Sequence, residues 1–177
     1  QELRKAKDED FIVSPETSVS GEEFQRLFKA LMQWPVGFSP LRKVEKLIQD
    51  KIKLFETEGK ADWATGELLA YASLLASGFE VRLSGEDVKR GTFSHRHAVI
   101  YDQHTNEPYN RLSTLGGQQG KSYIYNSLLS EFAVLGFEFG YAMANPNNLV
   151  IWEAQYGDFA NGAQTIIDQY IIGAEQK

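Results

Sequence analysis

Residues 62–83 read DWATGELLAYASLLASGFEVRL, and they contain the clearest indication of the fold class. Asp62 can cap a helix whose apolar residues recur at helical spacing, and Gly78 is a typical residue to end that helix. The next five residues, 79–83, alternate between apolar and polar in the manner of a short strand. A capped helix that leads directly into a strand is the repeating unit of α/β proteins.

The alternation of helices and strands continues toward the C-terminus. Strands separated by helices favour a mainly parallel sheet with helices on both faces, so we expect an α/β fold. The predicted strands are 97–101, 123–125 and 149–152, and the predicted helices are 130–144 and 160–172.

Ligands of such sheets bind in the crevice beyond the carboxyl ends of the strands. In this sequence that rule points to three segments, 84–96, 127–131 and 153–164. Residues 116–120, GGQQG, lack both the spacing of a dinucleotide fingerprint and the Lys-Ser/Thr of a P-loop, so we interpret them as a turn.

Two helices are predicted ahead of the α/β region. Ser20 and Glu23 can form a capping box, and the apolar residues that follow recur at i, i+3, i+4 and i+7. A second helix is predicted to start at Ser39-Pro40 and to end at Gly59. Its other faces are rich in Lys and Glu, most simply as a solvated surface.

These patterns divide the chain into three parts. Residues 1–19 are charged with little periodicity, so we expect a linker that need not be ordered. Residues 20–59 form a helical lead-in segment, and residues 60–177 form the α/β part. The chain starts without Met and stops just after an apolar element, so we expect it to be a fragment of a longer polypeptide.

Composition limits the classes of protein that fit. The 177 residues, 42% of them hydrophobic, suffice for one packed domain, and the net charge of −6 with scattered basic residues argues against nucleic acid as a partner. Cysteine is absent, as are a secretory leader and an apolar run of the roughly 20 residues that a membrane helix needs. We expect an intracellular protein without membrane contact, in the cytoplasm or, alternatively, in the mitochondrial matrix.

Glu131 is the first candidate for chemistry. It follows Ser127-Leu128-Leu129-Ser130 and opens an otherwise apolar helix. A carboxylate in the first turn of a helix also interacts favourably with the helix dipole. Simple stabilisation of the helix end is therefore the alternative to a catalytic role.

A second group of candidates lies in the predicted loops. Arg96 could hold the carboxylate of a substrate through two hydrogen bonds, with His95 and His97 beside it, or it could simply be a solvated cation of a loop. The two histidines lack a third ligand, so no metal site is expected. Tyr156 and Phe159 could stack on a ring, or they could simply close the core. Residue chemistry alone indicates an acidic α/β domain with a crevice.

Five stretches of sequence are more specific than these single residues. Together they resemble the first-component (E1) subunit of the 2-oxoglutarate dehydrogenase complex, strongly over residues 60–177 and more weakly over residues 10–60. The part resembled is the start of a transketolase-type pyrimidine-binding domain. The stretches are DWATGE (62–67), RLSGED (82–87), RGTFSHRHAV (90–99), NSLLSE (126–131) and IWEAQYGDFANGAQ (151–164).

The resemblance implies a homodimer that binds thiamine diphosphate and Mg²⁺ between the diphosphate-binding domain of one subunit and the pyrimidine-binding domain of the other. It implies oxidative decarboxylation of 2-oxoglutarate and transfer of the succinyl unit to the lipoyl group of the E2 component. The metal and the diphosphate would be held by a domain outside this chain. We therefore expect neither metal binding nor turnover from residues 1–177 alone, and an exposed apolar edge that promotes association.

The resemblance also implies roles for single residues. Glu131 matches the glutamate that shares a proton with N1′ of the aminopyrimidine, and Leu129 matches the apolar wedge that holds the cofactor in a bent conformation. The remaining matches are Asp87 as an acidic residue near the cofactor, Tyr156 and Phe159 as candidates for stacking on the ring, and His95, Arg96 and His97 as candidates for binding substrate.

Two other classes stay open at this point. Another thiamine-dependent decarboxylase or transketolase-type enzyme would share the cofactor, and substrate competition on the whole polypeptide would separate it. A non-catalytic α/β module would keep the fold for assembly only, and the presence of both Glu131 and Leu129 argues against it.

Overall fold

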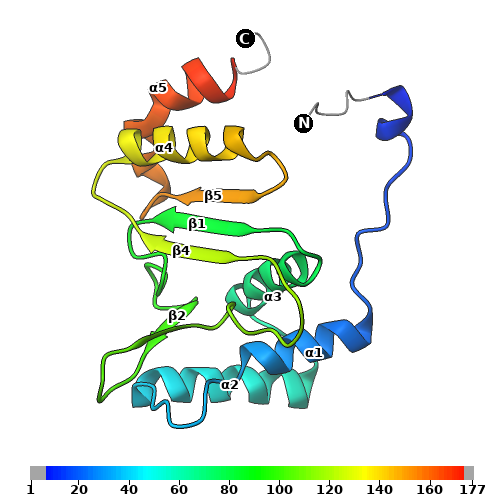
Figure 1. The fold of residues 1–177 in the computed structure, drawn as a ribbon, viewed down its shortest axis with the longest axis vertical. Coiled ribbons are helices and arrows are strands. Elements are labelled where there is room, and N and C mark those ends of the chain that lie inside the picture. The colour runs from blue at the N-terminus through cyan, green and yellow to red at the C-terminus, as the bar shows by residue number, and fades with distance from the viewer. Residues whose placement is uncertain (1–6, 174–177) are drawn as a thin grey trace.

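The computed structural model describes residues 7–173. Figure 1 shows a sheet with helices on either side of it and the N-terminal helices beneath. In chain order the elements are η1 (Asp8–Phe11), α1 (Gly21–Leu31), α2 (Arg42–Glu58), α3 (Trp63–Ala76), β1 (Val81–Gly85), β2 (Val99–Tyr101), β3 (Pro108–Asn110), β4 (Ser122–Asn126), α4 (Glu131–Ala144), β5 (Leu149–Glu153), η2 (Gly157–Ala163), α5 (Gln164–Ile166) and η3 (Ile167–Ile171).

β1 is the central strand of a three-stranded parallel sheet with the order β4–β1–β5. Its last residue, Gly85, lies opposite Asn126 of β4 and Glu153 of β5. All three strands therefore end at the same edge, and the segments that follow them begin side by side (Figure 1). The expected α/β class with a parallel sheet is confirmed.

Helices cover both faces of this sheet. Successive side chains of β1 point to opposite faces, so each face has side chains that pack against a helix. Val81 and Leu83 are fully buried in one cluster with the apolar side chains of α3. Arg82 points the other way and donates two hydrogen bonds to Glu138 of α4, at 2.7 and 2.8 Å. α3 and α4 thus lie on opposite faces (Figure 1).

The strand predicted at 97–101 forms outside the parallel sheet, which corrects that part of the expectation. β2 pairs antiparallel with β3, with Ile100 opposite Tyr109. The carboxylate of Asp102 accepts the N–H groups of His104 at 2.8 Å and Thr105 at 3.0 Å, which closes a turn and reverses the chain. A parallel pair would need a crossover connection, and none is built between β1 and β2.

The N-terminal helices begin differently from the prediction in detail. Ser20 caps α1 by accepting the N–H of Glu23 at 3.2 Å, but the Glu23 carboxylate binds Arg26 at 2.7 and 2.6 Å instead of completing the box. α2 begins later than predicted, because the N–H of Ser39 donates to the carboxylate of Asp102 at 2.6 Å. Ser39 therefore binds the turn between β2 and β3 and does not cap α2.

One hydrophobic core joins these helices to the α/β part. Leu31 of α1 and Ile48 of α2 are fully buried in the same cluster as α3 and β1. The predicted segments 20–59 and 60–177 therefore share a core over the described residues. Their separation as domains stays a prediction.

The two ends of the described chain are simpler. Residues 1–6 of the predicted linker lie outside the described part, and residues 12–19 form no helix or strand. The predicted helix 160–172 follows a helical path, but through successive 3-10, α and π turns. Within residues 7–173, no helix is both long and apolar enough to cross a membrane.

Candidate functional site

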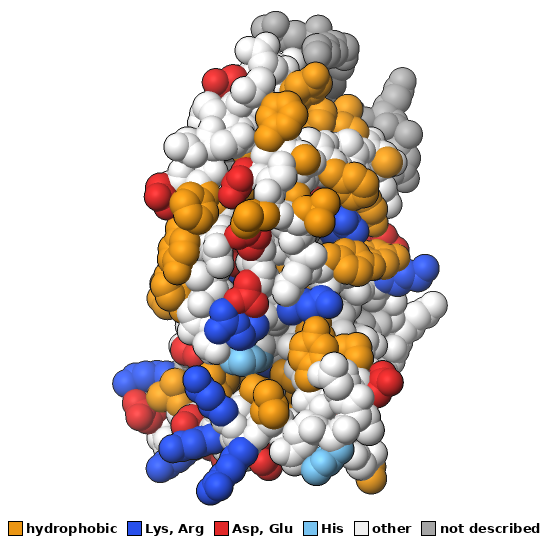
Figure 2. Space-filling model, turned by 90° about the vertical axis from the view of Figure 1, so that its left-hand side faces the viewer, with side chains coloured by type: hydrophobic (Ala, Val, Ile, Leu, Met, Phe, Trp, Pro, Cys, Tyr) orange, Lys and Arg blue, Asp and Glu red, His pale blue; other side chains and the backbone are white. Residues whose placement is uncertain are grey.

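The carboxyl edge of the sheet carries a small cavity, and Figure 2 views the molecule from this side. Over the upper half of this face, hydrophobic side chains surround a few carboxylates, whereas Lys and Arg gather near the bottom (Figure 2). All three segments predicted to flank a crevice contribute to the cavity. Its lining residues are Glu86, Ser127, Leu128, Ser130, Glu131, Trp152, Glu153, Ala154 and Gln155.

Glu131 is half-buried at the first position of α4 and lines this cavity. Ser130 caps the helix by accepting the N–H of Ala133 at 3.3 Å, so the cap does not need the Glu131 carboxylate. That carboxylate packs beside Gly162 of η2 and makes no hydrogen bond or ion pair with the described residues. A carboxylate held at a positive helix end without a partner can share a proton with a ligand.

Leu128 and Leu129 precede this helix and are 81% and 84% exposed. Tyr125 and Phe132, on either side of them in sequence, are exposed as well. An exposed apolar group of this size indicates a surface that contacts a ligand or another part of a larger protein. The role of Leu129 as a wedge stays a prediction.

Tyr156 and Phe159 belong to a cluster of aromatic rings at the same edge. The Tyr156 ring meets Phe159 and Phe93 in T-shaped contacts, with centroids 5.7 and 6.0 Å apart. Phe93 lies in the segment after β1, so the cluster joins that segment to the one after β5. Stacking of Tyr156 or Phe159 on a ring stays a prediction, and Phe93 is a member that the sequence did not single out.

Asp87 shapes a turn rather than lining the cavity. Its φ is +57°, its carboxylate accepts a hydrogen bond from Nε of Arg90 at 2.9 Å, and its carbonyl oxygen accepts the N–H of Gly91 at 2.7 Å. The neighbouring Glu86 lines the cavity, and its Oε1 is buried without a hydrogen-bond partner among the described residues. An approach of Asp87 to a cofactor stays a prediction.

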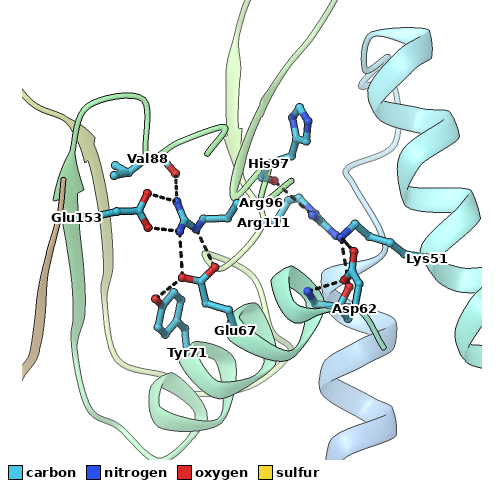
Figure 3. Close-up of polar contacts among 10 residues, drawn as sticks. Lys51, Asp62, Glu67, Tyr71, Val88, Arg96, His97, Arg111 and Glu153 are labelled. Atoms are coloured by element: carbon cyan, nitrogen blue, oxygen red, sulfur yellow. Dashed lines mark hydrogen bonds and ion pairs between the residues drawn. The ribbon is translucent and has the colours of Figure 1, made fainter. Parts of the chain in front are cut away.

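Arg96 is 2% exposed, and its guanidinium lies between two carboxylates (Figure 3). Nε and Nη2 donate to Glu67 at 2.9 and 3.0 Å, Nη1 donates to Glu153 at 3.1 Å, and Nη2 also donates to Glu153. Nη1 makes a further bond of 3.1 Å to the carbonyl oxygen of Val88. An arginine has five N–H donors, so this arrangement leaves none for a substrate carboxylate.

The electrostatics of Arg96 agree with this arrangement. Burial alone would lower the pKa of Arg96, but its hydrogen bonds to Glu153 and Glu67 outweigh burial and raise that pKa above its ordinary value. The guanidinium is therefore permanently charged. Direct contact between Arg96 and substrate would require some of these bonds to break.

The two histidines beside Arg96 have different surroundings. His95 packs over Gly91, lines a cavity of about 490 Å³ beside α2, and has a buried Nδ1 without a partner among the described residues. His97 is buried, with Nε2 3.1 Å from the carbonyl oxygen of Ser94. Burial, helped by nearby cations, outweighs that bond and lowers the pKa of His97, so its ring is mainly neutral at pH 7. Of the two, His95 is the one placed to meet a ligand.

The partners of Arg96 were not predicted from the sequence. Glu67 lies on α3 among buried residues, and Tyr71, one turn later, donates its hydroxyl to Glu67 at 2.7 Å. A carboxylate on the apolar side of a helix needs a partner, and the position of Glu67 among apolar residues was visible in the sequence. Which cation pairs with Glu67 depends on the tertiary structure.

The chemistry available at this edge suits a flat ring more than an ion. In the part of the chain that the structure describes, no group of three or more His, Asp or Glu side chains could hold a metal. The unpaired carboxylate of Glu131, the exposed leucines and the aromatic rings are together suited to a heteroaromatic group with a basic nitrogen.

Comparison with known proteins identifies the family of the chain. Residues 59–177 match the family described as "Transketolase, pyrimidine binding domain". The chain is 50% identical over 161 residues to the mitochondrial 2-oxoglutarate dehydrogenase of Saccharomyces cerevisiae, covering 91% of this chain and 16% of that protein. It is 46% identical over 169 residues to the 2-oxoglutarate dehydrogenase E1 component of Coxiella burnetii, covering 96% of this chain and 18% of that protein.

A third relative extends the set. The oxoglutarate dehydrogenase of Buchnera aphidicola is 48% identical over 164 residues, covering 93% of this chain and 18% of that protein. The resemblance to E1 subunits read from the five stretches is therefore confirmed. The chain spans less than a fifth of the length of these relatives.

Proposed function

Since the chain belongs to the transketolase pyrimidine-binding domain family, we propose that it is part of the E1 subunit of a 2-oxoglutarate dehydrogenase, where it holds the aminopyrimidine ring of thiamine diphosphate. The observation that carries the proposal is the Glu131 carboxylate. It lies at the N-terminus of α4, lines the cavity at the carboxyl edge, and has no partner among the described residues.

The side chains at this edge fit the pyrimidine end of the cofactor. Leu129 offers an exposed apolar surface, and Tyr156 and Phe159 offer exposed ring faces. Asp87 stands one residue beyond the cavity-lining Glu86 and would approach the same group. We propose that Mg²⁺ and the diphosphate are held elsewhere in the parent polypeptide, since residues 7–173 offer no cluster of metal ligands.

The residues of this chain would divide the work at the bound ring. Thiamine diphosphate, when bound, supplies the electron sink for decarboxylation of a 2-oxo acid. Glu131 would hold a proton at N1′, in a half-buried position where a hydrogen bond is stronger than in water. Leu128 and Leu129 would exclude water from the edge of the ring. His95 would offer a ring nitrogen on the substrate side, with His97 enclosed behind it.

The proposed substrate is 2-oxoglutarate, and the proposed acceptor of the succinyl unit is the lipoyl group of an E2 component. A second E1 subunit would complete the active site of a homodimer. The names and the 46% to 50% identity of the relatives support this reading. The relatives include mitochondrial and bacterial proteins. We propose the cytoplasm as the location here, and fractionation of the source cells tests it.

The first test replaces Glu131 in the full parent polypeptide. Glu131→Gln keeps the size of the side chain and removes its capacity to hold a proton, so we expect kcat to fall by about 10²- to 10⁴-fold. Decarboxylation of 2-oxoglutarate is measured with thiamine diphosphate, Mg²⁺ and an artificial electron acceptor.

Asp158→Asn is the matched control, because Asp158 is an exposed carboxylate in the first turn of the neighbouring η2. It should leave kcat unchanged. Full activity in Glu131→Gln would refute the role of Glu131. If the wild type acts on a different 2-oxo acid instead, the protein is another thiamine-dependent enzyme. If it acts on no 2-oxo acid, a non-catalytic module is favoured.

A further inference from the structure

One buried cation connects the segments around the proposed site. We use the term Arg96 network for the Arg96 guanidinium, the carboxylates of Glu67 and Glu153, and the carbonyl oxygen of Val88 (Figure 3). Glu67 comes from α3, Val88 from the segment after β1, and Glu153 from the end of β5. The loop that carries His95 is thereby tied to the strand that leads into the aromatic pair.

All hydrogen-bond donors of Arg96 are used within the network. Each of the five N–H donors of Arg96 has an acceptor, and the hydroxyl of Tyr71 holds Glu67 from behind at 2.7 Å (Figure 3). A fully used arginine fork defines the direction of both carboxylates as well as their distance. Lysine has one charged centre and no fork, so it cannot bridge the same acceptors in the same geometry.

The network also touches the site directly. Glu153 lines the same cavity as Glu131, although it is Arg96 that orients its carboxylate. Phe93, in the loop held by Arg96, meets Tyr156 with ring centroids 6.0 Å apart. A change in the placement of Arg96 would therefore displace both sides of the aromatic cluster together.

We propose that Arg96 is a positioning residue that acts through Glu153 and Glu67. It holds Glu153 at the Glu131 cavity and holds the loop that carries Phe93 and His95 against the aromatic pair Tyr156 and Phe159. It holds the site and does not bind the substrate. This inference rests on the proposed function of the same site. It replaces direct anion binding as the role of Arg96.

The chain offers a matched control on the other face of the sheet. Arg82 donates two hydrogen bonds to Glu138, and the exposed fractions of their side chains are 13% and 3%. This pair joins the middle of β1 to the middle of α4. It is as bidentate as the Arg96 contacts and nearly as buried, but neither residue lies in segment 84–96, 127–131 or 153–164.

The test compares Arg96→Lys, Glu67→Gln and the control Arg82→Lys in the full parent polypeptide. Titration calorimetry with Mg²⁺ measures the Kd of thiamine diphosphate, steady-state kinetics measure the KM of the 2-oxo acid substrate, and amide hydrogen exchange is followed on the cofactor-free protein. We expect Arg96→Lys to raise Kd and KM by about 10- to 100-fold, the loss typical of replacing a residue that orients a ligand-binding side chain.

Hydrogen exchange should become faster over residues 86–97 and 153–163 in Arg96→Lys, and only over the part of α4 around Glu138 in Arg82→Lys. The control should leave Kd and KM unchanged. Glu67→Gln, which retains the bond to Glu153, should shift Kd and KM in the same direction by less, and it serves as the test if Arg96→Lys does not fold.

Three results would overturn the proposal. The first is that Arg96→Lys reduces the amount of folded enzyme and lowers kcat while Kd and KM stay at wild-type values, which would show that Arg96 has a merely structural role. Equal shifts of Kd and KM in Arg96→Lys and Arg82→Lys would show a general loss of stability. If the wild type fails to bind thiamine diphosphate, the proposed function fails. Unchanged exchange over both segments in Arg96→Lys would then still refute the network.

Discussion

Two buried arginines illustrate how single residues organise this chain. Arg96 is surrounded by carboxylates, whereas Arg111 donates only to neutral acceptors, chiefly the carbonyl oxygens of Leu31 at 2.6 and 2.9 Å and of His97 at 3.3 Å. Without a countercharge, burial lowers the pKa of Arg111 to about 10. Arg96 therefore assembles the site, and Arg111 joins the end of α1 to the loop that carries the histidines.

Asp102 leads to a prediction about acid stability. Its carboxylate accepts backbone N–H groups from Ser39, Thr105 and His104, which lower its pKa to about 2. The unfolded carboxyl titrates near pH 3.9, so the stabilisation from Asp102 is fully present above about pH 4 and is lost as the pH falls toward 2. Asp102→Asn should lower the Tm at neutral pH and reduce the fall of Tm between about pH 4 and pH 2.

Thermal unfolding of the chain across this pH range measures the effect. Asp50→Asn, at an exposed carboxylate of α2, is the control and should leave the curve as in the wild type. A pH dependence in Asp102→Asn as steep as that of the wild type would contradict the assignment.

At the scale of elements, the packing of β1 against β5 leads to a second prediction. A Cβ atom on Gly85 would overlap the backbone carbonyl oxygen of Glu153, and the φ of Gly85 is +153°. Gly85→Ala should therefore separate the carboxyl ends of the two strands, lower the Tm and weaken thiamine diphosphate binding in the parent polypeptide.

Gly66→Ala in α3 provides the comparison, because its Cβ would meet nothing within 4 Å. It should stabilise the protein by about 0.5–1 kcal/mol, since alanine restricts the unfolded chain and favours the helix. Calorimetric Tm and cofactor Kd report both variants. If Gly85→Ala leaves both Tm and Kd unchanged, the ends of β1 and β5 can move apart without loss of stability or cofactor binding.

The C-terminal helical segment shows what periodicity leaves undetermined about an element. The sequence predicts one helix over 160–172, and the chain follows it through 3-10, α and π turns. These turns have similar spacing of side chains and differ in the hydrogen-bond partner. A pattern of apolar residues therefore predicts the helical path but not the type of turn.

At the scale of the whole molecule, the surface of α4 and the adjoining strand end is unusually apolar. We call this surface the α4 face. It consists of the exposed side chains Tyr125, Leu128, Leu129, Phe132, Phe137 and Met143. Exposed apolar groups of this extent promote association in water.

The isolated 177-residue chain should therefore self-associate through the α4 face. Leu128→Lys should lower the apparent mass at a given concentration, because a charge in the middle of the face is costly to bury. Light scattering across a concentration series measures this. Val36→Lys, at a fully exposed valine in the loop before α2, is the control and should leave the mass unchanged. Equal behaviour of the two variants would refute a specific face.

Much of the site could be read from local patterns. Glu131 became a candidate because an acidic residue opens an apolar helix, and the resemblance supplied its expected role. The three segments at the edge were predicted because parallel strands end at one edge. The environments of His95 and His97 could not be distinguished, because one residue separates them in sequence and tertiary packing alone buries one of them.

The sequence by itself determined the helix limits at Asp62, Gly59 and Gly78, the strands of the parallel sheet and the family, because caps, periodicity and motifs are properties of neighbouring residues. Only the tertiary structure decided that β2 leaves the sheet and that Arg96 is occupied by Glu67 and Glu153. Those carboxylates are 29 and 57 residues away along the chain. A buried charge takes whichever partner the fold brings within reach, and no local pattern encodes that choice.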